Sequence, residues 1–210
     1  MIVLPRLYPI LDAGCFPNAL GLITAAEELL SAGVTLIQYR NKSSNARVML
    51  EQAHELSRQL RARATAPHLL KLIMNDRVDL CLVAEFDGVH VGQDDLSPES
   101  VRSIIGPDRW LGVSTHNPEQ LLEADRNSAD YLAIGPVFST SSKDRPDPVV
   151  GLEGVRRARQ LTRKPLVAIG GITRSNAASA IEAGADSVAV ISDLLRDPRK
   201  SAEEFFRILR

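Results

Sequence analysis

The feature that most constrains this chain is a repeating pattern of short apolar runs, each followed by a segment with helical character. Two such runs are residues 166–172 (LVAIGGI) and 187–192 (SVAVIS). An unbroken apolar run of this length is typical of a strand buried on both faces, as in a parallel sheet. Gly170 and Gly171 leave bare backbone N–H groups beside the next helix, and this arrangement favours phosphate binding.

Six similar units precede these two along the chain. The expected strands cover residues 7–11, 35–39, 69–74, 88–92, 110–113 and 131–137. The expected helices cover residues 20–32, 45–64, 78–84, 152–161, 175–183 and 202–209, and two more open at Ser97-Pro98 and Asn117-Pro118. Eight strand–helix pairs in 210 residues predict an α/β protein that folds as a single (β/α)8 TIM barrel over residues 1–210. An open doubly wound sheet is the alternative.

Charge and composition exclude several kinds of partner. The net charge is −1, so the chain has no general basic field, and neither nucleic acid nor an anionic membrane is an expected partner. No apolar run approaches the ~18 residues of a membrane span, and the first residues lack the pattern of a signal peptide. Cys15 and Cys81 are far apart in sequence, so we expect free thiols in a cytoplasmic protein.

In such a barrel the active site lies at the carboxyl ends of the strands, and polar residues gather there in this chain. The cations Arg40, Lys42 and Lys143 follow the second and sixth strands. Asp76 and Asp95 follow adjacent strands, whose axes lie about 4.8 Å apart, so their carboxylates can share one hard cation. Mg²⁺ takes one or two protein carboxylates and completes its shell with water and phosphate oxygens. This set predicts two anionic substrates, one of which carries a diphosphate.

Single residues in this set also have structural interpretations. Asp76 could cap the third helix, since Asp is a favoured N-cap residue, and Asp94 and Asp95 could form a solvated turn. Arg40 and Lys42 could be surface charges at a strand end.

The sequence also suggests roles for two of the four histidines and for one long loop. We expect His90 to pack inside the barrel rather than bind a ligand. For His116 a structural role, such as capping the fifth helix, is favoured over contact with substrate, and His54 and His68 carry no signal. The polar stretch 139–149 is long for a strand-to-helix loop, which suggests a functional lid.

Six short motifs stand at these strand ends. They are Gln38-Tyr39-Arg40-Asn41-Lys42, Asn75-Asp76, residues 88–95 (GVHVGQDD), Gly112-Val113-Ser114, residues 135–143 (GPVFSTSSK) and Gly170-Gly171-Ile172. Together they resemble the thiamine-phosphate synthase family, and the resemblance covers nearly the whole chain. Asn41 stands where the family often has Glu, and Ser142 where Thr is usual. By alternation Asn41 should point away from the site, whereas Ser142 keeps a hydroxyl group.

The resemblance implies a transferase of thiamine biosynthesis that uses Mg²⁺ and has small-molecule substrates. The enzyme would join 4-amino-2-methyl-5-(diphosphooxymethyl)pyrimidine to 4-methyl-5-(2-phosphoethyl)thiazole and release diphosphate. The pyrimidine amino group can push electrons toward the CH2–O bond, so diphosphate can leave before the thiazole nitrogen attacks. Such a step needs charge stabilisation on the leaving group rather than a general base. A homo-oligomer is compatible with this expectation.

The resemblance also implies residue roles. The expected diphosphate ligands are Arg40, Lys42, Asn75 and Lys143, with Ser114 nearby. The expected metal ligands are Asp76 and Asp95, and Gln38 would contact the aminopyrimidine. The groups expected around the thiazole phosphate are Thr140, Ser142 and the backbone of Gly171, Ile191 and Ser192. The residues expected to act in catalysis are Lys42, Ser114 and Lys143.

Three other functions compete with this one. A thiazole tautomerase-type relative has a similar barrel but, as the resemblance implies, lacks the full diphosphate and Mg²⁺ set. An isomerase or aldolase of sugar phosphates needs a general base or a Schiff-base lysine inside the barrel, and Lys71 is the only lysine near an expected strand interior. A barrel that binds thiamine precursors without catalysis is the third.

Overall fold

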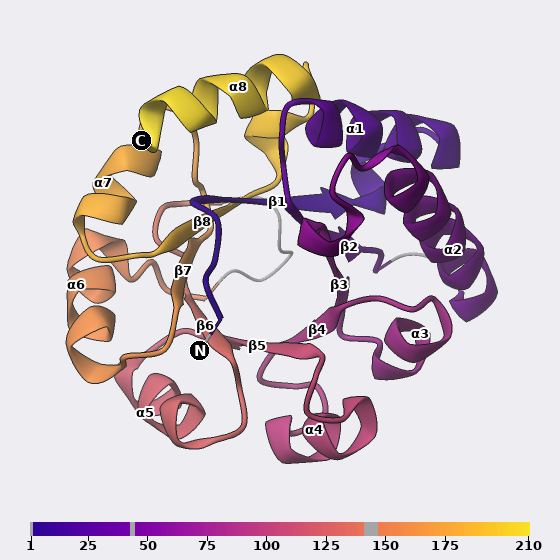
Figure 1. Ribbon diagram of the computed structural model, residues 1–210. Helices are drawn as coiled ribbons and strands as arrows, with labels where there is room; N and C mark the ends of the chain where they lie inside the picture. Colours follow the sequence, from indigo (N-terminus) through magenta and orange to yellow (C-terminus); the bar gives the residue numbers. More distant parts are fainter. Residues whose placement is uncertain (1, 43–44, 141–146) are drawn as a thin grey trace.

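A computed structural model describes residues 2–42, 45–140 and 147–210. Its eight parallel strands form a closed barrel in sequence order, and the helices surround it (Figure 1). The strands are β1 (Leu7–Asp12), β2 (Leu36–Arg40), β3 (Lys71–Asn75), β4 (Gly88–Val91), β5 (Trp110–Thr115), β6 (Tyr131–Ile134), β7 (Leu166–Ile169) and β8 (Ser187–Val190). The pairing of Leu7 with Val188 joins β1 to β8, so the expected (β/α)8 barrel is confirmed and the open sheet is wrong.

The helices begin mostly where the sequence provides a cap. They are α1 (Ala19–Ser31), α2 (Ala46–Arg63), α3 (Val78–Val83), α4 (Pro98–Ile105), α5 (Pro118–Arg126), α6 (Gly151–Leu161), α7 (Ala177–Glu182) and α8 (Pro198–Ile208). The Ser97 and Asn117 side chains accept bonds from the backbone N–H groups of Ser100 and Gln120, as a helix start with Pro next in sequence predicts. Short 3-10 turns are η1 (Ala13–Cys15), η2 (Pro67–Leu69) and η3 (Ser192–Leu194).

Several expected boundaries are wrong by one residue or more, and four of them have clear local reasons. The third strand begins at Lys71 instead of residue 69, because η2 occupies the preceding residues. The sixth strand ends at Ile134, just before a Gly-Pro pair, and proline has no N–H group for the sheet. The seventh helix begins at Ala177, after a turn in which Thr173 N–H donates to Asn176. The eighth begins at Pro198, because Asp197 caps it.

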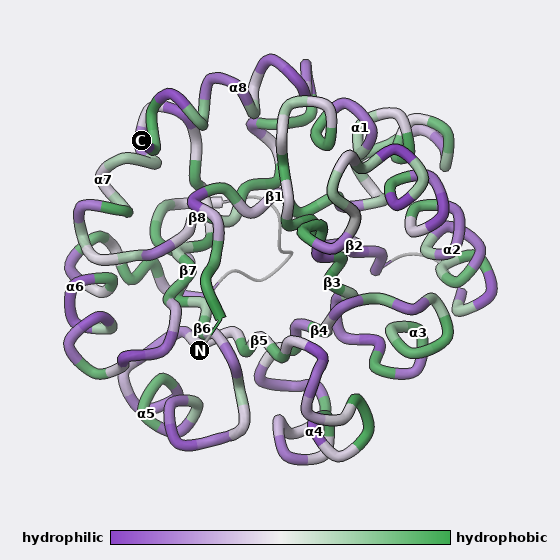
Figure 2. Tube along the Cα trace, in the orientation of Figure 1, coloured by the Kyte–Doolittle hydropathy of each residue, from purple (hydrophilic) through white to green (hydrophobic). Residues whose placement is uncertain are grey.

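Apolar side chains form two separate cores. The larger core lies between the outer face of the barrel and the helices, and Figure 2 shows hydrophobic residues concentrated on the strands and on parts of the helices that face them. The smaller core fills the barrel interior, where Leu4 and the inward side chains of the strands pack. It comprises Leu4, Tyr8, Ile10, Leu36, Ile73, Tyr131, Ala133, Val167 and Ala189.

A repeated ion pair stabilises the amino ends of the strands. An aspartate lies just before each of β4, β6 and β8. Its carboxylate accepts a backbone N–H from the strand that precedes it in the chain (β3, β5 or β7). It also pairs with an arginine of the helix that leads into that preceding strand (α2, α4 or α6). The three sets are Asp87 with Leu72 and Arg61, Asp130 with Leu111 and Arg102, and Asp186 with Leu166 and Arg159. The arginine nitrogen lies 2.6–2.8 Å from the carboxylate in each set.

Two further expectations can be checked across the described residues. Cys15 is exposed and Cys81 is buried, and both are free thiols as expected. Within the described part of the chain, no helix is long and apolar enough to cross a membrane.

Candidate active site

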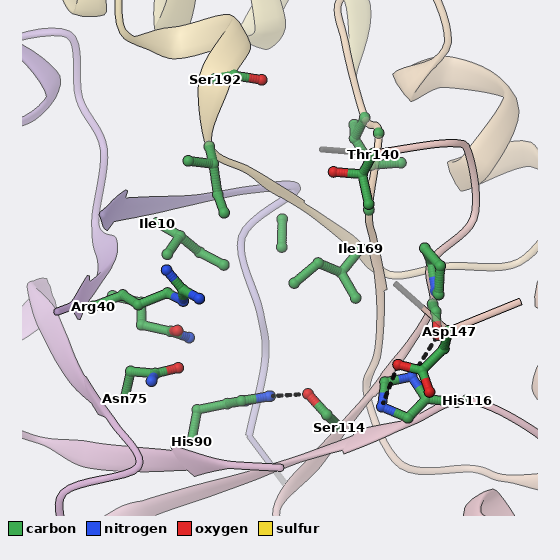
Figure 3. Close-up of a pocket in the computed structure, with 18 of the residues that line it drawn as sticks. Ile10, Arg40, Asn75, His90, Ser114, His116, Thr140, Asp147, Ile169 and Ser192 are labelled. Carbon is green, nitrogen blue, oxygen red and sulfur yellow. Dashed lines mark hydrogen bonds and ion pairs between the residues drawn. The ribbon is translucent and has the colours of Figure 1, made fainter. Parts of the chain in front are cut away.

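A cavity of about 300 Å³ opens at the carboxyl ends of the strands. Residues in or directly after each of the eight strands contribute to its lining. The expected site residues among them are Gln38, Arg40, Asn75, Ser114, Thr140, Gly171, Ile191 and Ser192. In Figure 3, Arg40 and Asn75 lie on one side, Thr140 and Ser192 on others, and Ile10 and Ile169 between them. The structure therefore brings most of the expected set together, whereas Ser142 and Lys143 lie outside the described residues.

Three charged side chains, those of Lys42, Asp76 and Asp95, lie next to this cavity. Asp76 directly follows the lining residue Asn75 in the sequence. Lys42 donates a hydrogen bond to the Asp76 carboxylate, and Asp76 also contacts Asp95. Burial raises the pKa of Asp76; Lys42 lowers it and the neighbouring Asp95 carboxylate raises it. Lys42, whose side chain is 56% exposed, pairs with Asp76, and the adjacent Asp95 carboxylate adds negative charge that a cation could offset.

The backbone at Asp76 is unusual. Its φ of 59° lies in the left-handed region, which costs free energy for a residue with a side chain and is common at functional sites. The third helix is capped at Arg77, without a side-chain bond, so the expectation that Asp76 is a helix cap is wrong. Asp95 does close a turn, since its Oδ2 accepts the Gly92 N–H at 2.8 Å, and it reaches Asp76 as well.

The donor set at this pair suits a hard cation. Among the described residues, no cluster of three or more His, Cys, Asp or Glu side chains could hold a metal ion. If a metal binds here, Asp76 and Asp95 would supply two oxygen ligands and leave the other positions to water and phosphate oxygens, which is how Mg²⁺ is usually held.

Arg40 is fixed by a partner that sequence reasoning missed. It forms an ion pair with Asp12 at the end of β1, and Asp12 also accepts the Gly14 N–H at 3.1 Å. The Arg40 side chain is 19% exposed and points into the cavity, so a role as a surface charge is wrong for this residue (Figure 3). The signal was available, because Asp12 is an acidic residue at a strand end.

A buried chain of hydrogen bonds crosses the barrel beneath the cavity. Gln38 Nε2 donates to Tyr8 Oη at 2.9 Å, and Tyr8 Oη lies 2.9 Å from Tyr131 Oη. Tyr131 Oη lies 3.1 Å from His90 Nδ1. His90 Nε2 lies 2.9 Å from Ser114 Oγ (Figure 3). Burial raises the pKa of both tyrosines and lowers that of His90 to about 4, so all three are neutral near pH 7.

The end of β7 requires both of its glycines. Gly170 and Gly171 have φ values of 93° and 65°, which favour glycine. A Cβ atom at Gly170 would lie 2.6 Å from Pro136 Cα, and one at Gly171 would lie 2.4 Å from the Ser139 carbonyl oxygen. The close approach of residues 136–139 is thus one reason why both positions are glycine, and room for a bound phosphate would be a second.

Comparisons with known proteins decide the family. Residues 7–194 match the family described as thiamine monophosphate synthase. Over 209 residues the chain is 59% identical to the thiamine-phosphate synthase of Koribacter versatilis (strain Ellin345), a match that covers 98% of this chain and 96% of that protein. The chain belongs to the thiamine monophosphate synthase family.

Two further relatives agree with this membership. The thiamine-phosphate synthase of Chloroflexus aurantiacus (strain ATCC 29366 / DSM 635 / J-10-fl) is 46% identical over 187 residues, covering 89% of this chain and 83% of that protein. The solved structure of thiamine phosphate pyrophosphorylase from Pyrococcus furiosus superposes with a TM-score of 0.84 at 34% identity, covering 97% of this chain and 95% of that one.

Asn41 behaves as expected for a departure from the thiamine monophosphate synthase pattern. Its Nδ2 donates to Gln52 Oε1 of α2 at 3.0 Å and lies 3.3 Å from Tyr39 Oη. Its side chain therefore points away from the cavity, and the prediction from alternation is confirmed.

His116 does not cap α5, the structural role suggested from the sequence, but lies in the cavity lining. Asn117, not His116, caps α5, so the capping interpretation is wrong. His116 lines the cavity, where its Nδ1 lies 2.6 Å from the Gly135 carbonyl oxygen and its Nε2 lies 3.5 Å from Asp147 Oδ2. His90 packs inside the barrel as expected and also lines the cavity. The lid hypothesis for 139–149 stays a prediction, because residues 141–146 lie outside the described residues.

Proposed function

We propose that this chain, a thiamine-phosphate synthase and thus a transferase by family, joins the aminopyrimidine methyl diphosphate to the thiazole phosphate and releases diphosphate. One observation carries the proposal: cationic and amide side chains and a glycine-rich turn with hydroxyl groups line the same cavity. Two small anionic substrates can therefore meet there. A cytoplasmic location and a homo-oligomer remain proposals beside it.

We place the diphosphate beside β2 and β3. Arg40 offers a planar pair of N–H donors that suits phosphate oxygens, and Asn75 adds an amide on the same side. Lys42 stands next to them, and Lys143 would approach from the loop after β6. Asp76 and Asp95 would hold Mg²⁺, which when bound would neutralise charge on the leaving diphosphate.

We place the thiazole phosphate at the ends of β7 and β8. Phosphate groups in barrels commonly sit in the loops after these two strands, where backbone N–H groups point outward. Gly171, Ile191, Ser192 and Thr140 line this part of the cavity, and the backbone of the first three and the Thr140 hydroxyl group would meet the phosphate. Ser142 would add a second hydroxyl group.

The space between the two anions suits a cationic intermediate. Ile10, Ile169 and Ala189 line it and limit the access of water to the reacting carbon. Gln38 would orient the aminopyrimidine, and Lys42, Ser114 and Lys143 would stabilise the charge that develops on the diphosphate. The step needs no general base, and His90, whose pKa is lowered to about 4 by burial, is a weak base near pH 7.

One assay tests the proposed function. The purified chain is mixed with both precursors, with Mg²⁺ or with a chelator, and thiamine phosphate and diphosphate are measured. We expect equal amounts of the two products with Mg²⁺ and a large loss with the chelator. Binding of the thiazole phosphate without any product would support the non-catalytic binding barrel, and a new thiazole isomer would support the tautomerase-type relative.

A further inference from the structure

The hydrogen-bond chain from Gln38 to Ser114 can run in either of two directions. When the Gln38 amide nitrogen donates to Tyr8, the Tyr8 hydroxyl has Tyr131 as its acceptor, and the Tyr131 hydroxyl has His90 Nδ1. His90 then carries its proton on Nε2 and donates to Ser114 Oγ. The hydroxyl hydrogen of Ser114 is left for a group in the cavity.

The reverse direction uses the same heavy atoms. If the Gln38 amide oxygen faces Tyr8, each hydroxyl group in the chain turns around, and His90 carries its proton on Nδ1 instead. Ser114 then donates to His90 Nε2 and offers only lone pairs to the cavity. An amide orientation and a histidine tautomer are therefore linked, because every buried hydrogen in the chain needs an acceptor.

We propose that Tyr8, Tyr131 and His90 couple the orientation of the Gln38 amide to the donor state of Ser114, so that a ring amino group bound at Gln38 makes Ser114 a hydrogen-bond donor to the anion. The identity of the two ligands rests on the proposed function. A substrate amino group donates to the amide oxygen and turns the amide nitrogen toward Tyr8. A ring oxygen at that place accepts instead, reverses the chain and turns the lone pairs of Ser114 toward the diphosphate.

The barrel interior is built to hold this chain. Tyr8 and Tyr131 are 1% and 0% exposed, so water does not compete for their hydroxyl groups. Neither tyrosine lines the cavity, whereas Gln38, His90 and Ser114 do, so the tyrosines are positioning residues. Their rings also meet edge to face, with centroids 6.1 Å apart.

A glycine makes room for the central link. A Cβ atom at Gly112 would lie 2.1 Å from Tyr131 Cζ and 2.3 Å from His90 Nδ1. Any side chain there would separate the two groups that share the hydrogen bond. The two rings lie with centroids 5.5 Å apart and fill the space above Gly112.

The first experiment observes the His90 tautomer by ¹⁵N NMR of histidine-labelled protein at pH 9. His90 is one of four histidines, and its signals are identified by their loss in His90→Gln. In the wild-type chain with the aminopyrimidine diphosphate and Mg²⁺ we expect the proton on Nε2. In Gln38→Glu the introduced carboxylate is ionised and can only accept from Tyr8, so we expect the proton on Nδ1. The same tautomer in both would overturn the proposal.

The second experiment tests the coupling through kinetics. Tyr131→Phe keeps the ring and removes one hydroxyl group, and we expect kcat to fall about tenfold while the KM for the thiazole phosphate hardly changes. The same change in a Ser114→Ala background should cost almost nothing, because the chain then has no donor to control. Losses that multiply would show a packing effect only and would overturn the coupling.

Tyr39→Phe is the matched control. Tyr39 is also fully buried, and its hydroxyl group donates to Gln52 Oε1 at 2.6 Å on the outer side of the barrel. We expect its kcat to match that of the wild type. The tautomer comparison needs binding of the aminopyrimidine diphosphate but no turnover, so it still decides the coupling if the wild-type chain binds this ligand and makes no thiamine phosphate.

Discussion

Aspartates at the amino ends of the strands are paired differently from Asp76 and Asp95 at the carboxyl ends. At the amino ends of the strands, Asp87 and its two counterparts each have an arginine partner and a backbone N–H donor. At the carboxyl ends, Asp76 pairs with Lys42, whose side chain is 56% exposed, and the adjacent Asp95 carboxylate repels Asp76. Asp87 and its counterparts are thus fully paired at one end, whereas at the other end Asp12 is paired with Arg40 but Asp76 and Asp95 are only partly paired.

This difference separates stability from function. A paired carboxylate that also binds the backbone holds adjacent strands together, and its removal leaves a buried N–H group without an acceptor. A pair of carboxylates with too little positive charge nearby, such as Asp76 and Asp95, lowers the stability of the folded chain. Binding of a cation would restore that stability. Barrels of this kind divide these tasks between their two ends, and four sets of variants can break or sharpen the division here.

The largest effect should come from the carboxyl end. We expect Asp76→Asn and Asp95→Asn each to lower kcat by about 10²–10³ while the chain stays folded, because each removes one ligand of the proposed Mg²⁺. The two losses should not multiply, since both residues would serve one ion. Turnover is measured over a range of Mg²⁺ concentrations, and high Mg²⁺ should partly restore each single variant.

Asp94→Asn is the control for this pair, as Asp94 is exposed and adjacent to Asp95 in sequence. It should keep full activity, and the affinity for thiazole phosphate should change little in all three variants. A fully active Asp76→Asn enzyme at low Mg²⁺ would remove Asp76 from the metal site.

The next effect should appear at the amino end and in stability alone. Asp87→Ala leaves the Leu72 N–H group and Arg61 without their shared partner, so we expect the free energy of unfolding to fall by about 2 kcal/mol. Urea denaturation gives this value, and the kcat of the folded fraction should be unchanged. Glu51→Ala breaks an exposed pair with Arg47 and should cost less than about 1 kcal/mol. Equal losses from both variants would contradict the contrast.

A third effect, in the layer between the two ends, depends on pH. The pKa of His90 is lowered from 6.5 to about 4 by burial. His90 in the folded state therefore binds its proton at a lower pH than His90 in the unfolded chain. This residue therefore contributes stability above pH 6.5 that is lost as the pH falls toward 4, and about 2 kcal/mol of it should be gone at pH 5.

The variant His90→Gln isolates that contribution. Urea denaturation at pH 7 and pH 5 should show a smaller decrease for the variant than for the wild-type chain, because all other titrating groups are common to both. Equal decreases would mean that His90 is charged in the folded barrel.

The smallest effect should come from the glycine turn after β7. Gly171→Ala would push its Cβ against the Ser139 carbonyl, so we expect residues 138–140 to shift and thiazole-phosphate affinity to fall about tenfold. Gly33→Ala is matched, because Gly33 also has a positive φ of 96° but no atom near its Cβ. The Gly33→Ala variant should lower the free energy of unfolding by about 1 kcal/mol. Titration of each ligand should show unchanged binding. Weaker binding in both would point to a general folding defect.

Much of this molecule could be predicted from its sequence because the rules involved are local. Apolar runs between helical segments fix the barrel, and its geometry then gathers Gln38, Arg40 and Asn75 at one end. The boundary errors came from short-range competition, such as η2 before β3 and the Asp197 cap before α8.

What could not be predicted depends on packing across the barrel. Tyr8 and Tyr131 come from strands on different sides of the barrel, and nothing in their separate sequence neighbourhoods says that their hydroxyl groups meet. The Asp12–Arg40 pair requires the register in which these two residues are direct partners of β1 and β2. The binding roles of the site residues, including Lys143 and Ser142, stay predictions.

The pairing of β1 with β8 has a consequence for how the chain is made. During synthesis β8 emerges last, and until it arrives both β1 and β7 present strand edges with unpaired backbone groups. Exposed edges of this kind recruit other chains and lead to aggregation. A ribosome that stalls before residue 187 would therefore release an aggregation-prone product, and chaperone demand should be highest just before the last strand closes the ring.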